Sequence, residues 1–166
     1  QFFTQFLPYV KTVESDYKNK IASVFADRKI KHKSYLKTIP FSDLKAFEII
    51  LKKLPKNLNL HFSNSSSIRY AQLFKIAASI DVSCNRGTSG IDGSTSTAIG
   101  SAIASEKPTL LITGDVSFLY DSNALWNDYI PKDFKIIVIN NGGGGIFRIL
   151  PGHQENQVFN TFFETS

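Results

Sequence analysis

The spacing of the apolar residues changes near residue 56, and this change predicts two parts of different structure. Before it, apolar side chains recur every three or four residues, as on one face of a helix; they are Phe3, Phe6, Val10, Val13, Tyr17, Ile21 and Val24. We expect one long helix that begins after Pro8, and a second that begins after Ser42 and ends at Pro55. The inward-facing residues of the second helix would be Phe47, Ile50, Leu51 and Leu54. Residues 1–56 are therefore predicted to form a helical segment that packs on the rest of the chain.

After residue 56, short apolar runs alternate with helical patterns. The runs that we expect to be strands are residues 58–62, 82–84, 110–113 and 136–139. The segments with helical character between them are residues 68–80, 94–104 and 119–127. Strands that alternate with helices are typical of parallel sheets, because each parallel crossover runs through a helix. Residues 57–166 are therefore predicted to be one α/β domain, with a doubly wound, mostly parallel sheet and helices on both faces.

The charge of the chain is unevenly distributed. Residues 1–56 contain 12 of the 19 Lys and Arg residues and 5 of the 14 Asp and Glu residues, which gives this segment a net charge of +7. Residues 57–166 have a net charge of −2. A nucleic-acid interface would use the lysines at 29, 31, 33 and 37 against phosphates. No alternation of aromatic and basic residues accompanies them. We therefore interpret the basic excess as the solvated face of a helix and expect no nucleic-acid partner.

Other features of the composition indicate the cellular compartment in which we expect the protein. No apolar run approaches the roughly 20 residues of a membrane span, and the first residues lack the basic start and cleavage site of a signal peptide. The single cysteine, Cys84, excludes an internal disulfide and fits a reducing cytosol, so we expect a cytoplasmic protein. We interpret its thiol as structural rather than nucleophilic. The chain contains no Met, and we expect it to be a piece of a longer protein.

Four polar loops follow the predicted strands. They are residues 63–67, 85–93, 114–117 and 140–145. In open α/β sheets, ligands bind at the carboxyl edge, where such loops lie. Asp115 could ligate a metal or cap a helix, and Asn141 could offer an amide oxygen or serve as a turn residue with positive φ. Together with a carbonyl from the glycine run 142–145, these oxygens suit Mg²⁺.

Other chemistries find less support. The three histidines, at 32, 61 and 153, lack the spacing of zinc ligands. There is neither a phosphate-binding P-loop nor a dinucleotide fingerprint. The glycine run precedes the apolar residues 146–150, so close approach of backbone to a ligand explains it better than a linker does. Arg69 and Arg86 lie among small residues near the same edge, and each could clamp a carboxylate or phosphate or form a surface salt bridge.

These loops resemble those of a known enzyme family. Gly114-Asp115, followed by Asn140-Asn141 after an apolar strand, resembles the metal–diphosphate motif of thiamine-diphosphate enzymes. Three further segments are similar to the 2-succinyl-5-enolpyruvyl-6-hydroxy-3-cyclohexene-1-carboxylate synthases of menaquinone biosynthesis. They are Ser63-Asn64-Ser65 with Arg69, the segment Asn85 to Gly93, and the segment Asn140 to Phe147. The resemblance covers about residues 60–151.

The resemblance implies thiamine diphosphate as cofactor, with Mg²⁺, or alternatively Mn²⁺, on its diphosphate. The implied metal ligands are Asp115, Asn141 and the carbonyl of Gly143. The implied cofactor contacts are Ser89, Ile91, Gly114, Ser117, Asn141 and Gly143, with Ile91 wedged between the two cofactor rings. The implied substrate contacts are Ser65, Arg69, Arg86, Ile146, Phe147 and Leu150. The family often has Asn where this chain has Gly142, and a residue other than glycine where it has Gly145.

The resemblance also implies a transferase reaction, in which 2-oxoglutarate loses CO₂ and the resulting carbanion adds to isochorismate. The family's activating glutamate comes from a different domain, normally of a neighbouring subunit. We therefore expect no catalytic residue in this chain, a truncated cofactor-binding fold that is inactive alone, and a homodimer or homotetramer in the full-length parent. Two alternatives stay open: another thiamine-diphosphate 2-oxoacid decarboxylase or carboligase, and a non-catalytic binding module whose basic N-terminal helix docks a partner.

Overall fold

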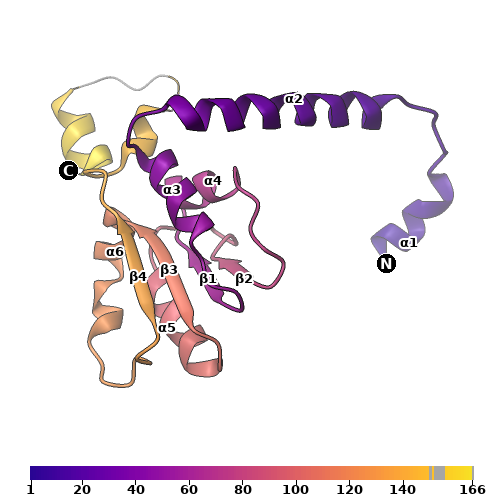
Figure 1. The fold of residues 1–166 in the computed structure, drawn as a ribbon. Coiled ribbons are helices and arrows are strands. Elements are labelled where there is room, and N and C mark those ends of the chain that lie inside the picture. Colours follow the sequence, from indigo (N-terminus) through magenta and orange to yellow (C-terminus); the bar gives the residue numbers. More distant parts are fainter. Residues whose placement is uncertain (150, 152–155, 166) are drawn as a thin grey trace. The chain divides into compact units, whose positions relative to one another are not determined.

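The computed structural model describes residues 1–149, 151 and 156–165 (Figure 1). The chain divides into two compact units, residues 1–40 and residues 41–166. The sequence analysis placed its boundary after residue 56 instead. The difference concerns the helix α3 (Asp43–Lys52), which belongs to the second unit because the ring of Phe47 is fully buried in that unit's core.

The first unit consists of helices without a sheet. It contains α1 (Phe2–Phe6), the 3-10 turn η1 (Leu7–Tyr9) and the long helix α2 (Tyr17–Thr38). The long helix predicted after Pro8 begins at Tyr17, and residues 10–16 are not helical. The backbone N–H of Tyr17 donates to Ser15 Oγ, which satisfies one group of the first turn, and Lys20 pairs with Asp16 at 2.7 Å.

The second unit is built on a four-stranded, all-parallel sheet. Its strands are β1 (Asn59–Phe62), β2 (Asp81–Cys84), β3 (Thr109–Gly114) and β4 (Lys135–Ile139), in the spatial order β2-β1-β3-β4. All four predicted strands are confirmed to within one residue at each end. The register places Phe62 of β1 beside Cys84 of β2 and Ile112 of β3. The carboxyl ends of the strands therefore lie along one edge of the sheet.

Helices cover both faces of this sheet, which confirms the doubly wound fold (Figure 1). On one face, α3 and α4 (Ser66–Ala71) bury a cluster that includes Phe47, Leu60, Phe62 and Ile112. The ring of Phe47 lies 6.4 Å from that of Phe62, centroid to centroid. On the other face lie α5 (Ser94–Ala104) and α6 (Asp115–Tyr120), where small residues of α5 allow close packing on β1 and β3.

The helix ends depart from the sequence prediction more than the strand ends do. Helix α3 begins after Ser42 and α5 spans residues 94–104, both as predicted. The helix expected over residues 68–80 ends at Ala71, where backbone bonds from residues three apart tighten the chain into turns. The helix expected over residues 119–127 begins earlier, at Asp115, and is followed by the 3-10 turn η2 (Ser122–Leu125). Among the described residues, no helix has both the length and the apolar character required to cross a membrane.

Candidate functional site

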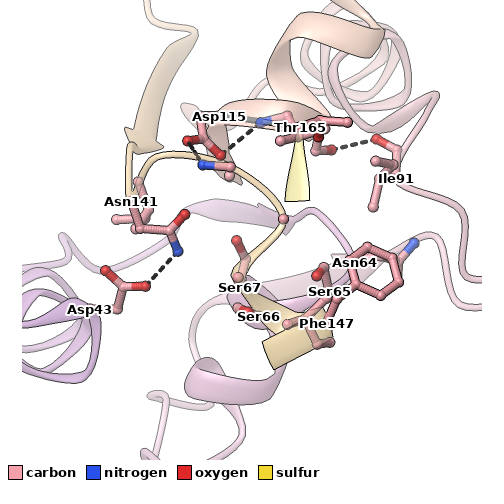
Figure 2. A pocket seen from close by; sticks show the side chains of 18 of the residues that line it. Asp43, Asn64, Ser65, Ser66, Ser67, Ile91, Asp115, Asn141, Phe147 and Thr165 are labelled. Carbon is pink, nitrogen blue, oxygen red and sulfur yellow. Dashed lines mark hydrogen bonds between the residues drawn. The ribbon is translucent and has the colours of Figure 1, made fainter. Parts of the chain in front are cut away.

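A cavity of about 280 Å³ opens at the carboxyl edge of the sheet (Figure 2). Its walls come from the ends of β1, β3 and β4 and from the start of α3, all within the second unit. Of the polar loops predicted to lie together, those after β1, β3 and β4 contribute most of the lining, and the loop after β2 contributes Ile91. The cavity is therefore the point where the candidate residues of the sequence analysis meet.

Asp115 joins two of these loops. It begins α6 directly after β3, because β3 ends at Gly114 and the chain turns there into the helix. One carboxylate oxygen, Oδ1, accepts from the backbone N–H of Val116 at 2.8 Å. The other, Oδ2, accepts from the backbone N–H groups of Gly142 at 3.0 Å and Gly143 at 2.9 Å. One carboxylate thus holds together two loops, although the bonded residues are 27 and 28 positions apart in sequence (Figure 2).

The glycine run after β4 is shaped by positive φ angles. Gly142 has φ 81° and Gly143 has φ 120°, values that residues with a side chain rarely adopt. At Gly144 a Cβ atom would lie 2.8 Å from the carbonyl oxygen of Phe163, so no side chain fits there without movement. At Gly145 there is no atom within 4 Å of an added Cβ. The departure from the family at Gly145 is therefore sterically neutral.

Asn141 lies at the mouth of the cavity with its amide engaged on one side. Its Nδ2 donates to Oδ2 of Asp43 at 2.8 Å. Asp43 is the first residue of α3 and lines the cavity, although the two residues are 98 positions apart. Sequence reasoning missed Asp43, because nothing in the local pattern distinguishes it from an ordinary acidic residue in the first turn of a helix.

The loop after β2 is attached to the cavity wall at two points. Ser117 of α6 donates from its Oγ to the carbonyl of Ile91 at 2.5 Å, and both residues line the cavity. Ser89 does not line it; its φ is 62° and its hydroxyl bonds back to the carbonyl of Arg86 at 3.2 Å. The predicted pair Ile91 and Ser117 is therefore brought together, whereas Ser89 shapes the loop.

The second attachment is Asn64, a buried residue whose amide contacts three groups of the same loop and the thiol at the end of β2. Its Nδ2 donates to the carbonyls of Asn85 at 2.7 Å and Gly90 at 2.5 Å. Its Oδ1 accepts from Arg86 Nη1 at 3.0 Å and lies 3.5 Å from the thiol of Cys84. Burial raises the pKa of that thiol, with Arg86 opposing the shift. This agrees with the interpretation of Cys84 as structural.

The two predicted arginines flank Asn64 and Ser65 outside the cavity. Arg86 bonds to Asn64, and Arg69 Nη1 lies 3.5 Å from the carbonyl oxygen of Ser65. Ser65 lines the cavity, whereas neither arginine does. Both arginines are exposed residues. The structure therefore brings the arginines to the same strand end, beside the cavity rather than in its wall.

Aromatic and aliphatic side chains form the apolar part of the lining. Of the predicted residues, Ile146 and Phe147 are in it, and Leu150 lies outside the described residues. Sequence reasoning missed two rings from the short π-helix η4 (Phe159–Glu164), those of Phe162 and Phe163. Phe163 packs edge-on against Phe147 with the ring centroids 5.8 Å apart. The apolar residues around them give no signal in sequence that separates them from core positions.

The donor set favours a hard cation over zinc. The described residues contain no group of three or more His, Cys, Asp or Glu side chains that could hold a metal ion. The oxygen-bearing groups in the cavity lining include the carboxylate of Asp115, the amide of Asn141 and the backbone of Gly143, and the carboxylate of Asp43 bonds to the amide of Asn141. Oxygen donors of this kind suit Mg²⁺, which uses few protein carboxylates and completes its shell with water and phosphate oxygens.

Comparison with known proteins identifies close relatives along the whole chain. No family model matches the sequence. A 2-succinyl-5-enolpyruvyl-6-hydroxy-3-cyclohexene-1-carboxylate synthase of Flavobacterium psychrophilum is 68% identical over 165 residues, which are 99% of this chain. Proteins of the same name from Flavobacterium johnsoniae and Bacteroides thetaiotaomicron are 67% and 50% identical, over 99% and 72% of the chain. The chain spans about 30% of the length of the two Flavobacterium proteins and 22% of the Bacteroides protein.

Proposed function

Because the chain belongs to the 2-succinyl-5-enolpyruvyl-6-hydroxy-3-cyclohexene-1-carboxylate synthase family, we propose that it is the part of such a synthase that binds thiamine diphosphate and Mg²⁺. The observation that carries the proposal is the carboxylate of Asp115, which joins the turn after β3 to the glycine run after β4. The reaction proposed for the full-length parent is the transfer of a decarboxylated 2-oxoglutarate unit to isochorismate, a step of menaquinone biosynthesis, in the cytoplasm.

The oxygen donors of the cavity fit a divalent ion on a diphosphate. We assign the metal to Asp115, the amide oxygen of Asn141 and the carbonyl of Gly143. Gly114 and Ser117 lie beside Asp115 in the lining, where they can contact the diphosphate. When bound, thiamine diphosphate supplies the nucleophilic carbon and the electron sink for decarboxylation. What this chain adds is position and electrostatics, since a metal and backbone N–H groups offset the charge of the diphosphate.

Other residues of the chain hold the cofactor and substrates in place. Ile91 is β-branched and therefore stiff at χ1, and the bond from Ser117 fixes its backbone, which suits a wedge between two rings. The apolar wall with Ile146 and Phe147 excludes water from the reacting centre. Arg69 and Arg86 bond to Ser65 and Asn64 of the cavity lining, where they can bind the carboxylates of dicarboxylic substrates.

The activating glutamate is expected from another part of the full-length parent, in a neighbouring subunit. The proposal therefore includes an assembly of at least two copies, a homodimer or a homotetramer. The preference for 2-oxoglutarate rests on the two arginines, because a monocarboxylate such as pyruvate would leave one of them without a role. Turnover of the full-length parent with 2-oxoglutarate and with pyruvate tests this point. A clear preference for pyruvate would favour a different 2-oxoacid decarboxylase.

The test of the site is the substitution Asp115→Ala in the full-length parent. We expect the Mg²⁺ concentration needed for half-maximal activity to rise by roughly 100-fold or more, because a ligand and the support of the glycine run are lost together. Asp133→Ala is the matched control, since Asp133 is an exposed aspartate on the loop that precedes β4. Near-normal turnover of the Asp115 variant at limiting Mg²⁺ would exclude the assignment.

A further inference from the structure

The hydrogen bond between Asn141 and Asp43 determines which way the amide of Asn141 faces. An amide has a donating NH₂ end and an accepting oxygen end, and a carboxylate can only accept. With Nδ2 of Asn141 2.8 Å from Oδ2 of Asp43, the NH₂ end must face Asp43. The oxygen end then faces the other way. Figure 2 shows Asp43 and Asn141 facing each other at the cavity, with Asp115 on the far side of the glycine run.

Asp43 is itself held rigidly. It is the first residue of α3, whose N-cap is Ser42. One turn later, Phe47 is fully buried, and its ring lies 5.6 Å from that of Tyr70, centroid to centroid. Because α3 is fixed to the core through Phe47, the carboxylate at its start has a defined place at the cavity.

Two carboxylates on different helices therefore form hydrogen bonds with residues 141–143. Asp43 binds the side chain of Asn141, and Asp115 binds the backbone N–H groups of Gly142 and Gly143. Among the described residues, no lysine or arginine forms an ion pair with either carboxylate. The carboxylate of Asp115, which has no basic partner in the described part of the chain, and the oriented amide of Asn141 favour a divalent cation between the loop and α6.

We propose that Asp43 is a positioning residue for the metal site: it orients the amide of Asn141 so that its oxygen is presented as a metal ligand. This inference rests on the proposed function, since the cation is the one assigned to the diphosphate. Partners that orient a metal ligand from outside typically change metal affinity by about 10–100-fold when removed. Asp43 would act in this way without touching the metal.

The experiment measures Mn²⁺ binding to the full-length parent by electron paramagnetic resonance, with thiamine diphosphate present. Asp43→Ala removes the acceptor, and we expect the dissociation constant for Mn²⁺ to rise about 10–100-fold. Asp43→Asn keeps an acceptor oxygen and removes the charge, and we expect it to stay within about threefold of the wild type. In turnover assays, Asp43→Ala should need more Mg²⁺ but regain the wild-type kcat at saturation.

The outcomes separate the inference from the proposed function. Asp133→Ala serves as the surface control and Asp115→Ala as the variant that loses an assigned ligand. If the wild type binds no Mn²⁺, both the proposed function and the inference are overturned. If the wild type binds Mn²⁺ and Asp43→Ala binds it equally well, only the inference is overturned. If Asp43→Asn binds Mn²⁺ as weakly as Asp43→Ala does, the effect comes from the lost charge, and the orienting role is overturned. A thermal unfolding curve for each variant identifies any that fail to fold.

Discussion

Replacement of Asn64 by alanine should release the loop after β2 from the cavity wall. Asn64 is only 2% exposed, and its amide binds the carbonyls of Asn85 and Gly90 and the guanidinium of Arg86. Alanine can replace none of these bonds. Because Ser117 still holds Ile91, we expect local opening around Arg86 rather than unfolding of the domain.

The magnitude follows from the three bonds. A neutral hydrogen bond contributes a net of about 1 kcal/mol, and one to a charged group about 1.5–3 kcal/mol. We count about 1 kcal/mol for the bond to Arg86, below the range for charged groups, because Arg86 is an exposed residue and water replaces part of the bond. The sum is about 3 kcal/mol in favour of the closed loop. Since 1.4 kcal/mol corresponds to a factor of ten, the open population should rise about 100-fold.

Tryptic cleavage of the bond after Arg86 measures that population. Trypsin can recognise the exposed side chain of Arg86, but cleavage requires the surrounding backbone to open. The cleavage rate therefore follows the fraction of molecules with an open loop, provided that the loop recloses fast. We expect cleavage at this bond, followed by mass spectrometry, to be about 100-fold faster in Asn64→Ala. Asn64→Asp should be cleaved at least as fast although it keeps an acceptor for Arg86, because it places a carboxylate without donors against the carbonyl oxygens of Asn85 and Gly90.

The matched control is Asn59, at the other end of β1. It is also buried, and its Nδ2 donates to Ser105 Oγ at 2.8 Å, far along the chain from the loop. Asn59→Ala should cost about 1 kcal/mol of stability and leave cleavage after Arg86 unchanged. A rate for Asn64→Ala that stays within about threefold of the wild type would refute the reasoning, because it would mean that the amide of Asn64 does not hold the loop closed.

Three further predictions concern stability, each measured by urea or thermal unfolding. Burial lowers the pKa of His61 below its ordinary value of 6.5, so its stabilising contribution is complete above about pH 6.5 and is lost as the pH falls through the folded-state pKa; His61→Gln should flatten the dependence of stability on pH below 6.5, and an unchanged slope would exclude this role. Gly144→Ala should destabilise by about 1–3 kcal/mol because its Cβ meets the carbonyl of Phe163, whereas Gly145→Ala should be near neutral; equal effects would contradict the contact geometry. Phe47→Ala should cost about 3–5 kcal/mol, and a loss below 1 kcal/mol would show that α3 does not depend on this ring.

The strands differ in how clearly the sequence indicates them. Strand β3 is buried along nearly its whole length and stands out as an apolar run between polar loops. Strand β2, at the edge of the sheet, is mostly exposed and gives a weaker signal. The helix ends were harder, since they depend on local hydrogen bonds. The predicted helix over residues 68–80 stops at Ala71 because turn bonds replace the helical ones, and α6 begins four residues early because Asp115 already lies in its first turn.

The candidate site also has parts that were predictable from the sequence and parts that were not. The meeting of Asp115 with Gly142 and Gly143 was predictable, because the carboxyl ends of neighbouring parallel strands share one edge. Asp43 was not, because its place depends on how α3 packs through Phe47, a tertiary contact that no local spacing records. Asn64 was noticed as part of a family-like segment, but only its four contacts reveal that it holds the neighbouring loop.

The arginines show how a residue outside the cavity can still serve it. Asn64 and Ser65 line the cavity at the end of β1, and each holds one guanidinium beside the opening, Arg86 and Arg69 respectively. A guanidinium has five N–H donors. In the described part of the chain, Arg86 and Arg69 each use one of these donors in a hydrogen bond. The remaining donors can face a carboxylate that arrives from solvent. Under the proposed function, these donors are the groups that would bind the carboxylates of a dicarboxylic substrate beside the cavity.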